Sequence, residues 1–428
     1  MDVFLAIVVV LVVALIATSA RLYRLRRTRA MSLMFSGGWP ALIVGVVLGP
    51  EVSGLIETDT ILSATPLLIA GLGWVGLMVG LQGRRELLAK LPAGIGATVG
   101  VDCVVSAVLT GAVAIVGLGL WTGWSRPWQD YVEPVALLVA SATGWAMETR
   151  SLSSLSSAAS QRVALLIRLT GGLAAMVAIA QFGFAEKLVA RDAQGVLVTD
   201  LIGGGTGLAV TFALAALAGL LGRFAIRLAG RSDGEQLTVF LGLVAVVGGI
   251  ASQLGYSPLL AAMVTGIVIA NISTTDLLRF ERFIIKAEHI IAFLVFALAG
   301  LLMRVWVGWA EIGLALALVA VRVAIKPAIF QWGAQSVQAA QADNGKVAPV
   351  FEVGAMRFSP IRQSAVAAPI ALALTLIEPS DFNRSLLTIV ALTGILSALV
   401  TVALAAWNGR PRRRAEAPAA ARPQGATP

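Results

Sequence analysis

Gly45-Val-Val-Leu-Gly49-Pro50 and Gly266-Ile-Val-Ile-Ala270-Asn271 are two similar stretches of sequence, each inside an apolar run. When such runs are counted as membrane helices, about seven helices separate the two stretches. Seven is an odd number, so a repeat with this displacement is inverted in the membrane, which is typical of secondary transporters with a central binding site. The alternative is that these small residues only let neighbouring helices pack closely.

The composition around these stretches is that of an integral membrane protein. Of 428 residues, 58% are hydrophobic and 13% charged, and the mean hydropathy is +0.89, whereas a soluble domain carries about 25% charge. The single cysteine, Cys103, excludes an intramolecular disulfide and a cysteine-cluster metal site, and the single histidine, His289, excludes multi-histidine zinc sites. No serine-nucleophile elbow, phosphate loop or dinucleotide fingerprint is present. We therefore expect no enzyme, no cofactor and no metal centre.

Apolar runs of membrane-spanning length predict an all-α polytopic protein with about 13 transmembrane helices. The fifth, ninth, tenth and twelfth are too short to span a bilayer as straight rods. The fifth and twelfth, interrupted near residues 141–144 and 358–360, occupy matching positions of the two repeats, so we expect two discontinuous helices that cross. The thirteen runs are 3–20, 33–55, 61–81, 92–118, 134–147, 163–184, 203–221, 237–254, 258–272, 290–303, 305–325, 361–376 and 386–407.

The positions of the basic residues predict the orientation. The clusters 21–29, 223–231 and 410–414 are arginine-rich and all fall in the cytoplasm if the N-terminus lies outside. We therefore expect a multi-pass protein of the cell inner membrane with a cytoplasmic C-terminus. The formal net charge of +9 then reflects topology and not a nucleic-acid partner. Residues 1–409 form one transmembrane domain, and the Ala/Pro/Arg-rich residues 410–428 are expected to be a disordered cytoplasmic tail.

Several motifs, taken in order, resemble those of the cation:proton antiporter superfamily, the sodium/hydrogen exchanger-like membrane domain. Trp39 to Pro50 is similar to the second-helix motif of the family, Leu77 to Gln82 to its third-helix segment, and Ser141 to Gly144 to the Ser-Ala-Thr-Asp of its broken fifth helix. Arg168 to Leu173 falls where the sixth helix carries an acidic pair, and Gly354 to Gln363 is similar to a later stretch ending in Gly-Glu. The resemblance implies an inverted-repeat transporter, a homodimer in the lipid bilayer, and a monovalent cation and a proton as partners.

The sequence departs from this family at every position where the motifs carry an acid. It has Gln82 for Glu, Gly144 for Asp, Gly171-Gly172 for the acidic pair, and Arg362-Gln363 for Gly-Glu. A midplane carboxylate lets such a transporter alternate between a proton and a cation, because either can neutralise it. The exchange site is therefore expected to be rebuilt or lost.

The charged residues that remain at membrane depth are the candidates for a rebuilt site. Asp102 is expected to face Arg322 or Lys326, which lie four residues apart on one helix face. Asp102 is either a relocated carrier or half of a structural ion pair, and Arg168 either attracts an anion or extends toward the cytoplasmic interface. Hydroxyls and freed carbonyls at the helix breaks are further candidate ligands. The complete set of transport-site candidates is Asp102, Thr143, Gly144, Arg168, Thr170, Gly172, Arg322, Lys326, Ser359 and Arg362.

Three functions remain open at this point. The first is a secondary transporter resembling monovalent cation:proton antiporters, with Asp102 as carrier. The second is a carrier of a small anion or organic anion that uses Arg168, Arg322 and Lys326. The third is a membrane scaffold or sensor that has the fold without the transport.

Overall fold

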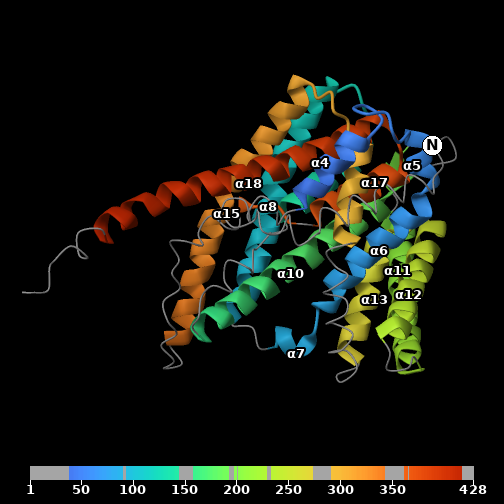
Figure 1. Cartoon of the computed structure of the whole chain (residues 1–428), viewed down its shortest axis with the longest axis horizontal. Helices are drawn as coiled ribbons and strands as arrows, with labels where there is room; N and C mark the ends of the chain where they lie inside the picture. Colours follow the sequence, from blue (N-terminus) through green and yellow to red (C-terminus); the bar gives the residue numbers. More distant parts are fainter. Residues whose placement is uncertain are drawn as a thin grey trace, which may run out of the picture.

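The chain folds into a bundle of helices of very different lengths (Figure 1). The structure is a computed structural model and describes residues 38–89, 93–143, 158–191, 197–199, 201–228, 233–272, 291–342, 361–364 and 366–416. Its helices are α4 (Trp39–Leu48), α5 (Thr58–Ser63), α6 (Thr65–Leu81), α7 (Arg85–Leu88), α8 (Ala93–Thr122), α9 (Val132–Thr143), α10 (Ala158–Leu188), α11 (Leu201–Leu228), α12 (Asp233–Gln253), α13 (Pro258–Ile272), Ile291–Leu302, α15 (Trp309–Ala342), α17 (Ala367–Ile377) and α18 (Asp381–Glu416).

The predicted all-α architecture is confirmed, and each predicted span from the second to the thirteenth overlaps one of these helices. The first, residues 3–20, lies outside the described residues. α15 begins at Trp309 and runs to Ala342, well past the predicted end at residue 325, with Pro327 inside it. α18 continues to Glu416, so residues 410–416 of the predicted disordered tail are helical, and the rest of that tail, residues 417–428, lies outside the described residues. A short antiparallel ribbon, β1 (Val189–Arg191) with β2 (Leu197–Thr199), joins α10 to α11.

Glycines bring two pairs of helices into backbone contact. A Cβ on Gly45 of α4 would lie 1.9 Å from the carbonyl oxygen of Ala297, and one on Gly300 would lie 2.1 Å from that of Leu42. Helices α6 and α13 make the same kind of contact, because a Cβ on Gly80 would lie 2.0 Å from the carbonyl oxygen of Met263. Only glycine permits such an approach.

These two contacts are related by the inverted repeat. The predicted register makes the second span the mate of the ninth, and the third span the mate of the tenth. A two-fold axis that exchanges these mates replaces the second span by the ninth and the tenth span by the third. A contact between the second and tenth spans therefore implies an equivalent contact between the ninth and third spans. The structure has both contacts, α4 against Ile291–Leu302 and α6 against α13. The similar stretches at residues 45–50 and 266–271 therefore serve equivalent packing roles in the two halves.

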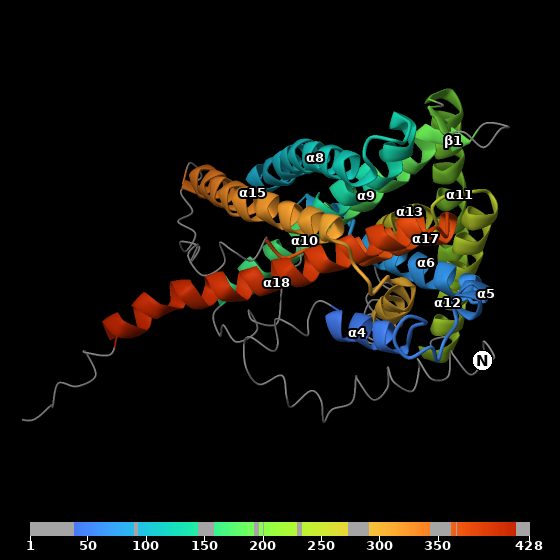
Figure 2. The same ribbon diagram turned by 90° about the horizontal axis from the view of Figure 1, so that it is seen from above.

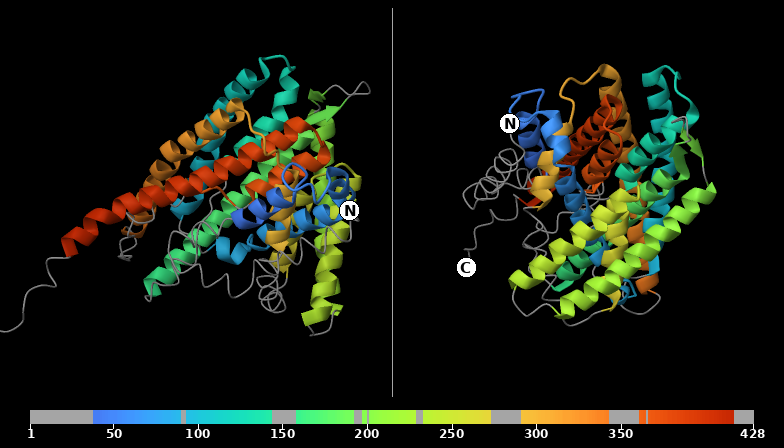
Figure 3. Two further views of the ribbon diagram at one scale, coloured as in Figure 1. Left: turned by 45° about the horizontal axis from the view of Figure 1, so that its top comes forward. Right: turned by 90° about the vertical axis from the view of Figure 1, so that its right-hand side faces the viewer.

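The helices form two groups that meet mainly along α10, with α17 also in contact with the first group. Helices α6, α11, α12 and α13 pack together on one side, and α8, α9, α10, α15, α17 and α18 pack together on the other (Figure 2). Figure 3 shows α18 running along the second group and extending beyond it. Helices α9 and α17 have 12 and 11 residues, so each rises only about 17 Å and covers about half of a hydrocarbon core of roughly 30 Å. Both therefore end at membrane depth.

Candidate functional site

A buried ion pair joins α8 to α15. Lys326 Nζ lies 2.7 Å from both carboxylate oxygens of Asp102, and the two side chains are 1% and 0% exposed. Ser106 Oγ, one turn along α8, donates to Asp102 Oδ1 at 3.2 Å. The sequence left open whether Asp102 meets Arg322 or Lys326, and the structure pairs it with Lys326.

Arg322, one turn before Lys326 on α15, binds backbone carbonyls at both helix breaks. Its guanidinium donates to the carbonyls of Ser141 and Ala142, at the end of α9. It also donates to Ile361 at 3.0 Å and to Arg362 at 2.9 Å, in the segment that leads into α17. The carbonyl end of α9 carries partial negative charge, which this buried cation neutralises, and the same guanidinium satisfies the two carbonyls before α17. Arg322 thereby ties the two interrupted helices together.

The end of α9 also contributes hydroxyl groups to this region. Thr143 Oγ1 lies 3.0 Å from the carbonyl oxygen of Val139 and 2.9 Å from Gln181 Oε1 of α10. The carbonyl oxygen of Thr143 lies 3.4 Å from Lys326 Nζ. Thr143 is therefore adjacent to the ion pair through its backbone, whereas its hydroxyl is turned toward α10. The contribution of Gln181 was not anticipated, because no motif in the sequence marks it.

Residues 82 and 172, at which the family motifs carry acidic residues, contact one another. Gln82, directly after α6, lies against Gly172 of α10, where an added Cβ would be 2.2 Å from Gln82 Oε1. An amide thus occupies the space that a side chain at position 172 would need. This neighbourhood carries no carboxylate from either residue.

Gln363 is a buried amide beside the second helix break. Its side chain is 7% exposed, and neither Oε1 nor Nε2 has a hydrogen-bond partner, although its backbone amide donates to Ser397 Oγ at 3.3 Å. A buried amide without partners is costly. The adjacent Arg362 is also buried.

The other candidates are only partly described. Thr170 is buried on α10. Arg168 lies on the same helix, but its side chain is outside the described residues, as are Gly144 and Ser359. The structure therefore brings together Asp102, Thr143, Arg322, Lys326 and Arg362.

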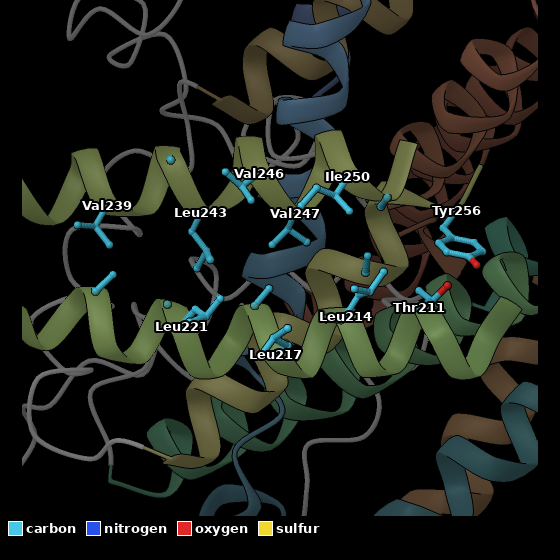
Figure 4. A pocket seen from close by; sticks show the side chains of 17 residues that line it. Thr211, Leu214, Leu217, Leu221, Val239, Leu243, Val246, Val247, Ile250 and Tyr256 are labelled. Atoms are coloured by element: carbon cyan, nitrogen blue, oxygen red, sulfur yellow. The ribbon is translucent and has the colours of Figure 1, made fainter. Parts of the chain in front are cut away.

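A groove lies between α11 and α12, in the other helix group (Figure 4). Its volume is about 310 Å³, and its lining is almost entirely aliphatic, with Thr211 and Tyr256 at one end. Such a lining suits hydrocarbon and offers an ion no charged group. We therefore place the candidate site at the ion pair and not in this groove.

The comparisons with known proteins agree with this fold. No protein-family model and no curated protein matches the sequence. The solved structure of the sodium proton antiporter MjNhaP1 from Methanocaldococcus jannaschii matches with a TM-score of 0.60 and 14% identity, over 95% of this chain and 97% of that chain. That structure is of a transporter and not of an enzyme. Among the described residues, four helices are long and apolar enough to cross a membrane. Together with this likeness, they make the chain a multi-pass membrane protein with the fold of a sodium proton antiporter.

Proposed function

We propose that the protein is a secondary transporter that exchanges a monovalent cation for a proton at Asp102 and Lys326. The observation that carries this proposal is the contact of Lys326 Nζ with both oxygens of a fully buried carboxylate. A membrane-depth carboxylate is expensive and is a functional candidate by default. Its counterion, a lysine, can release a proton, which an arginine does not.

The exchange balances in charge and in protons. With Lys326 protonated, its ammonium neutralises Asp102 and closes the carboxylate to other ions. When Lys326 Nζ releases its proton, Asp102 keeps a negative charge that Na⁺, K⁺ or Li⁺ can neutralise in its place. One proton leaves for each cation that binds, and the reverse step expels the cation. The carbonyl oxygen of Thr143, 3.4 Å from Nζ, is a further oxygen ligand for that cation.

The fold likeness supports this proposal from a second direction. The solved structure with the similar fold is of a sodium proton antiporter. The acids that the family motifs carry are absent here, but Asp102 provides one carboxylate close to the ends of the interrupted helices. The exchange site would thus have moved to α8 and not been lost. We include in the proposal a homodimer in the inner membrane, with its N-terminus outside.

An anion carrier is the second candidate, and the contacts favour it less. The guanidinium of Arg322 is already hydrogen-bonded to four carbonyls, and Lys326 is bound by Asp102. An anion would have to displace these partners. A scaffold or sensor without transport, the third candidate, predicts no ion flux at all.

A proteoliposome assay tests the proposal. A pH-sensitive dye reports the collapse of an imposed pH gradient after addition of Na⁺, K⁺ or Li⁺. We expect a response to at least one of these cations and its loss in Asp102→Asn, with the variant still folded by thermal unfolding. Glu311→Gln, which alters another buried carboxyl, one that accepts from the backbone amide of Gly308, is the matched control and should retain exchange. A folded wild-type protein without cation-dependent proton flux would overturn the proposal.

A further inference from the structure

An ion pair joins the two helix groups at the end of the molecule where α18 begins. Arg384, in the first turn of α18, lies 3.3 Å from the carboxylate of Glu51, in the segment that follows α4. The two side chains are 16% and 22% exposed. Arg384 Nε also donates to the carbonyl of Leu302 at 3.0 Å, and Glu51 Oε2 accepts from the backbone amide of Val305 at 2.7 Å. Both side chains are therefore also bound to the end of the helix Ile291–Leu302 and the segment after it.

The partners of Arg384 belong with the first helix group, whereas α18 belongs to the second. The helix Ile291–Leu302 contacts α4 through the glycines described above. It also packs on α6, because a Cβ on Gly71 would lie 2.9 Å from Val295 Cγ2. The ion pair therefore crosses the boundary between the two groups.

Further hydrogen bonds surround the ion pair at the same boundary. The backbone amide of Arg304 donates to Thr388 Oγ1 of α18 at 3.0 Å, and the Arg304 guanidinium donates to Ser385 Oγ at 3.3 Å. Ser385 and Thr388 are 1% and 2% exposed. These two side chains would meet water if the helix groups separated here.

The inverted repeat places an equivalent contact at the opposite end of the molecule. Val305 and Arg85 each lie five residues beyond the glycine that makes the close helix contact in the tenth and third spans. The backbone amide of Val305 donates to Glu51 Oε2, and the backbone amide of Arg85 donates to Asn271 Oδ1, both at 2.7 Å. The two ends therefore share this backbone contact and differ in the side chain that accepts it.

The accepting side chain at the opposite end is an amide and not a carboxylate. Asn271 Nδ2 donates to the carbonyls of Gly83 and Ile267 at 2.9 and 2.8 Å, and both of these residues belong with the first group. An amide carries no charge, so this contact adds no ion pair between the groups. At the α18 end, by contrast, the carboxylate of Glu51 binds Arg384 of the second group.

From this asymmetry we infer that Glu51 and Arg384 form a latch that holds the two helix groups closed at the α18 end. Secondary transporters expose their site to each side in turn by moving one bundle against the other. Opening at the α18 end breaks the ion pair, whereas opening at the opposite end leaves it intact. The latch therefore favours the conformation that is closed at the α18 end, which faces the outside by the predicted topology. Its role in transport rests on the proposed function, but the latch itself is tested without transport.

Thiol labelling at position 385 tests the latch. Cys103 is the single cysteine of the chain, so Cys103→Ser combined with Ser385→Cys places one reporter thiol at the buried boundary. The full-length protein is held in lipid nanodiscs, where both ends are accessible, and labelling by a water-soluble maleimide is followed by mass spectrometry. We expect Glu51→Gln to speed labelling about fivefold, the factor that corresponds to loss of a partly exposed ion pair. Arg384→Gln should speed it as well, and the double variant should be no faster than the faster single variant, because both remove the same pair.

Asp381→Asn is the matched control for the loss of a carboxylate beside Arg384. Asp381 lies 3.5 Å from Arg384, but both residues are on α18, so their ion pair does not join the groups. We expect this variant to be labelled at the unmodified rate. Acceleration by Asp381→Asn equal to that by Glu51→Gln would overturn the inference.

Amide hydrogen exchange gives a second measurement that needs no introduced cysteine. The backbone amide of Arg304 donates to Thr388 and not to Glu51, so its exchange rate reports separation of the groups and not the loss of its own partner. We expect it to exchange faster in Glu51→Gln. An unchanged rate in either measurement would show that Glu51 does not hold the groups together. A lack of cation-dependent proton flux would count against exchange at Asp102 and would leave both of these rates as expected.

Discussion

Lys326 Nζ lies 2.7 Å from each carboxylate oxygen of Asp102, and neither side chain reaches solvent. The two residues come from α8 and α15, which the inverted repeat makes equivalent helices. A buried pair of this kind is strongly destabilised when one partner is removed, because the other charge is left without compensation. The two residues proposed to exchange ions therefore also stabilise the helix bundle.

Replacement of Lys326 by arginine tests whether exchange requires proton release from this residue or only its positive charge. Arginine keeps a positive charge beside Asp102 but does not release a proton in proteins. We expect Lys326→Arg to fold and to lose cation-dependent proton flux in proteoliposomes. Exchange by Lys326→Arg at the wild-type rate would show that the proton is carried elsewhere.

A double-mutant cycle should show that the pair is coupled. Asp102→Asn and Lys326→Met each leave a buried partner unmatched, which costs about 3–5 kcal/mol. The double variant removes both charges, so we expect it to be more stable than the sum of the single effects predicts. Thermal unfolding of the four proteins in one detergent measures this difference. Additive effects would mean that the two charges do not interact in the folded protein.

Arg322 should matter for stability more than any exposed arginine. Its guanidinium satisfies carbonyls at the end of α9 and in the segment before α17, and each buried carbonyl left unpaired costs about 1–3 kcal/mol. We expect Arg322→Met to lower the Tm strongly and Arg322→Lys to lower it less, because an ammonium reaches fewer of the carbonyls. The control is Arg126→Lys, since Arg126 is exposed and rests on the Phe382 ring. An unchanged Tm in Arg322→Met would contradict this role.

The glycine contacts predict which small residues are required. Gly45→Ala and Gly80→Ala would each place a methyl group about 2 Å from a backbone carbonyl oxygen of a neighbouring helix, so the helices must separate. Overpacking of this kind costs about 1–3 kcal/mol. Gly249→Ala, on α12, meets no atom within 4 Å and should leave the Tm unchanged or slightly higher. Equal Tm values for all three variants would argue against the close contacts.

Hydropathy was sufficient to locate most of the helices, because a bilayer requires apolar runs of a certain length. The glycine-rich stretches at residues 45–50 and 266–271 also indicated the inverted repeat. Hydropathy did not locate the end of α15 at Ala342, since the polar last turns of that helix lie beyond the apolar run. Gln181 was missed as well. It lies 2.9 Å from the Thr143 hydroxyl, and no motif in the sequence marks it.

For the candidate site, the sequence by itself determined which charges lie at membrane depth and that Asp102 has two cations available, Arg322 and Lys326. One helical turn separates these two cations, so their spacing alone does not show which of them pairs with Asp102. Only the tertiary structure decided the assignment. The carbonyls at the end of α9 and in the segment before α17 surround Arg322, where a planar group with several donors satisfies them. Lys326, with its compact ammonium, pairs instead with Asp102 of the neighbouring helix α8.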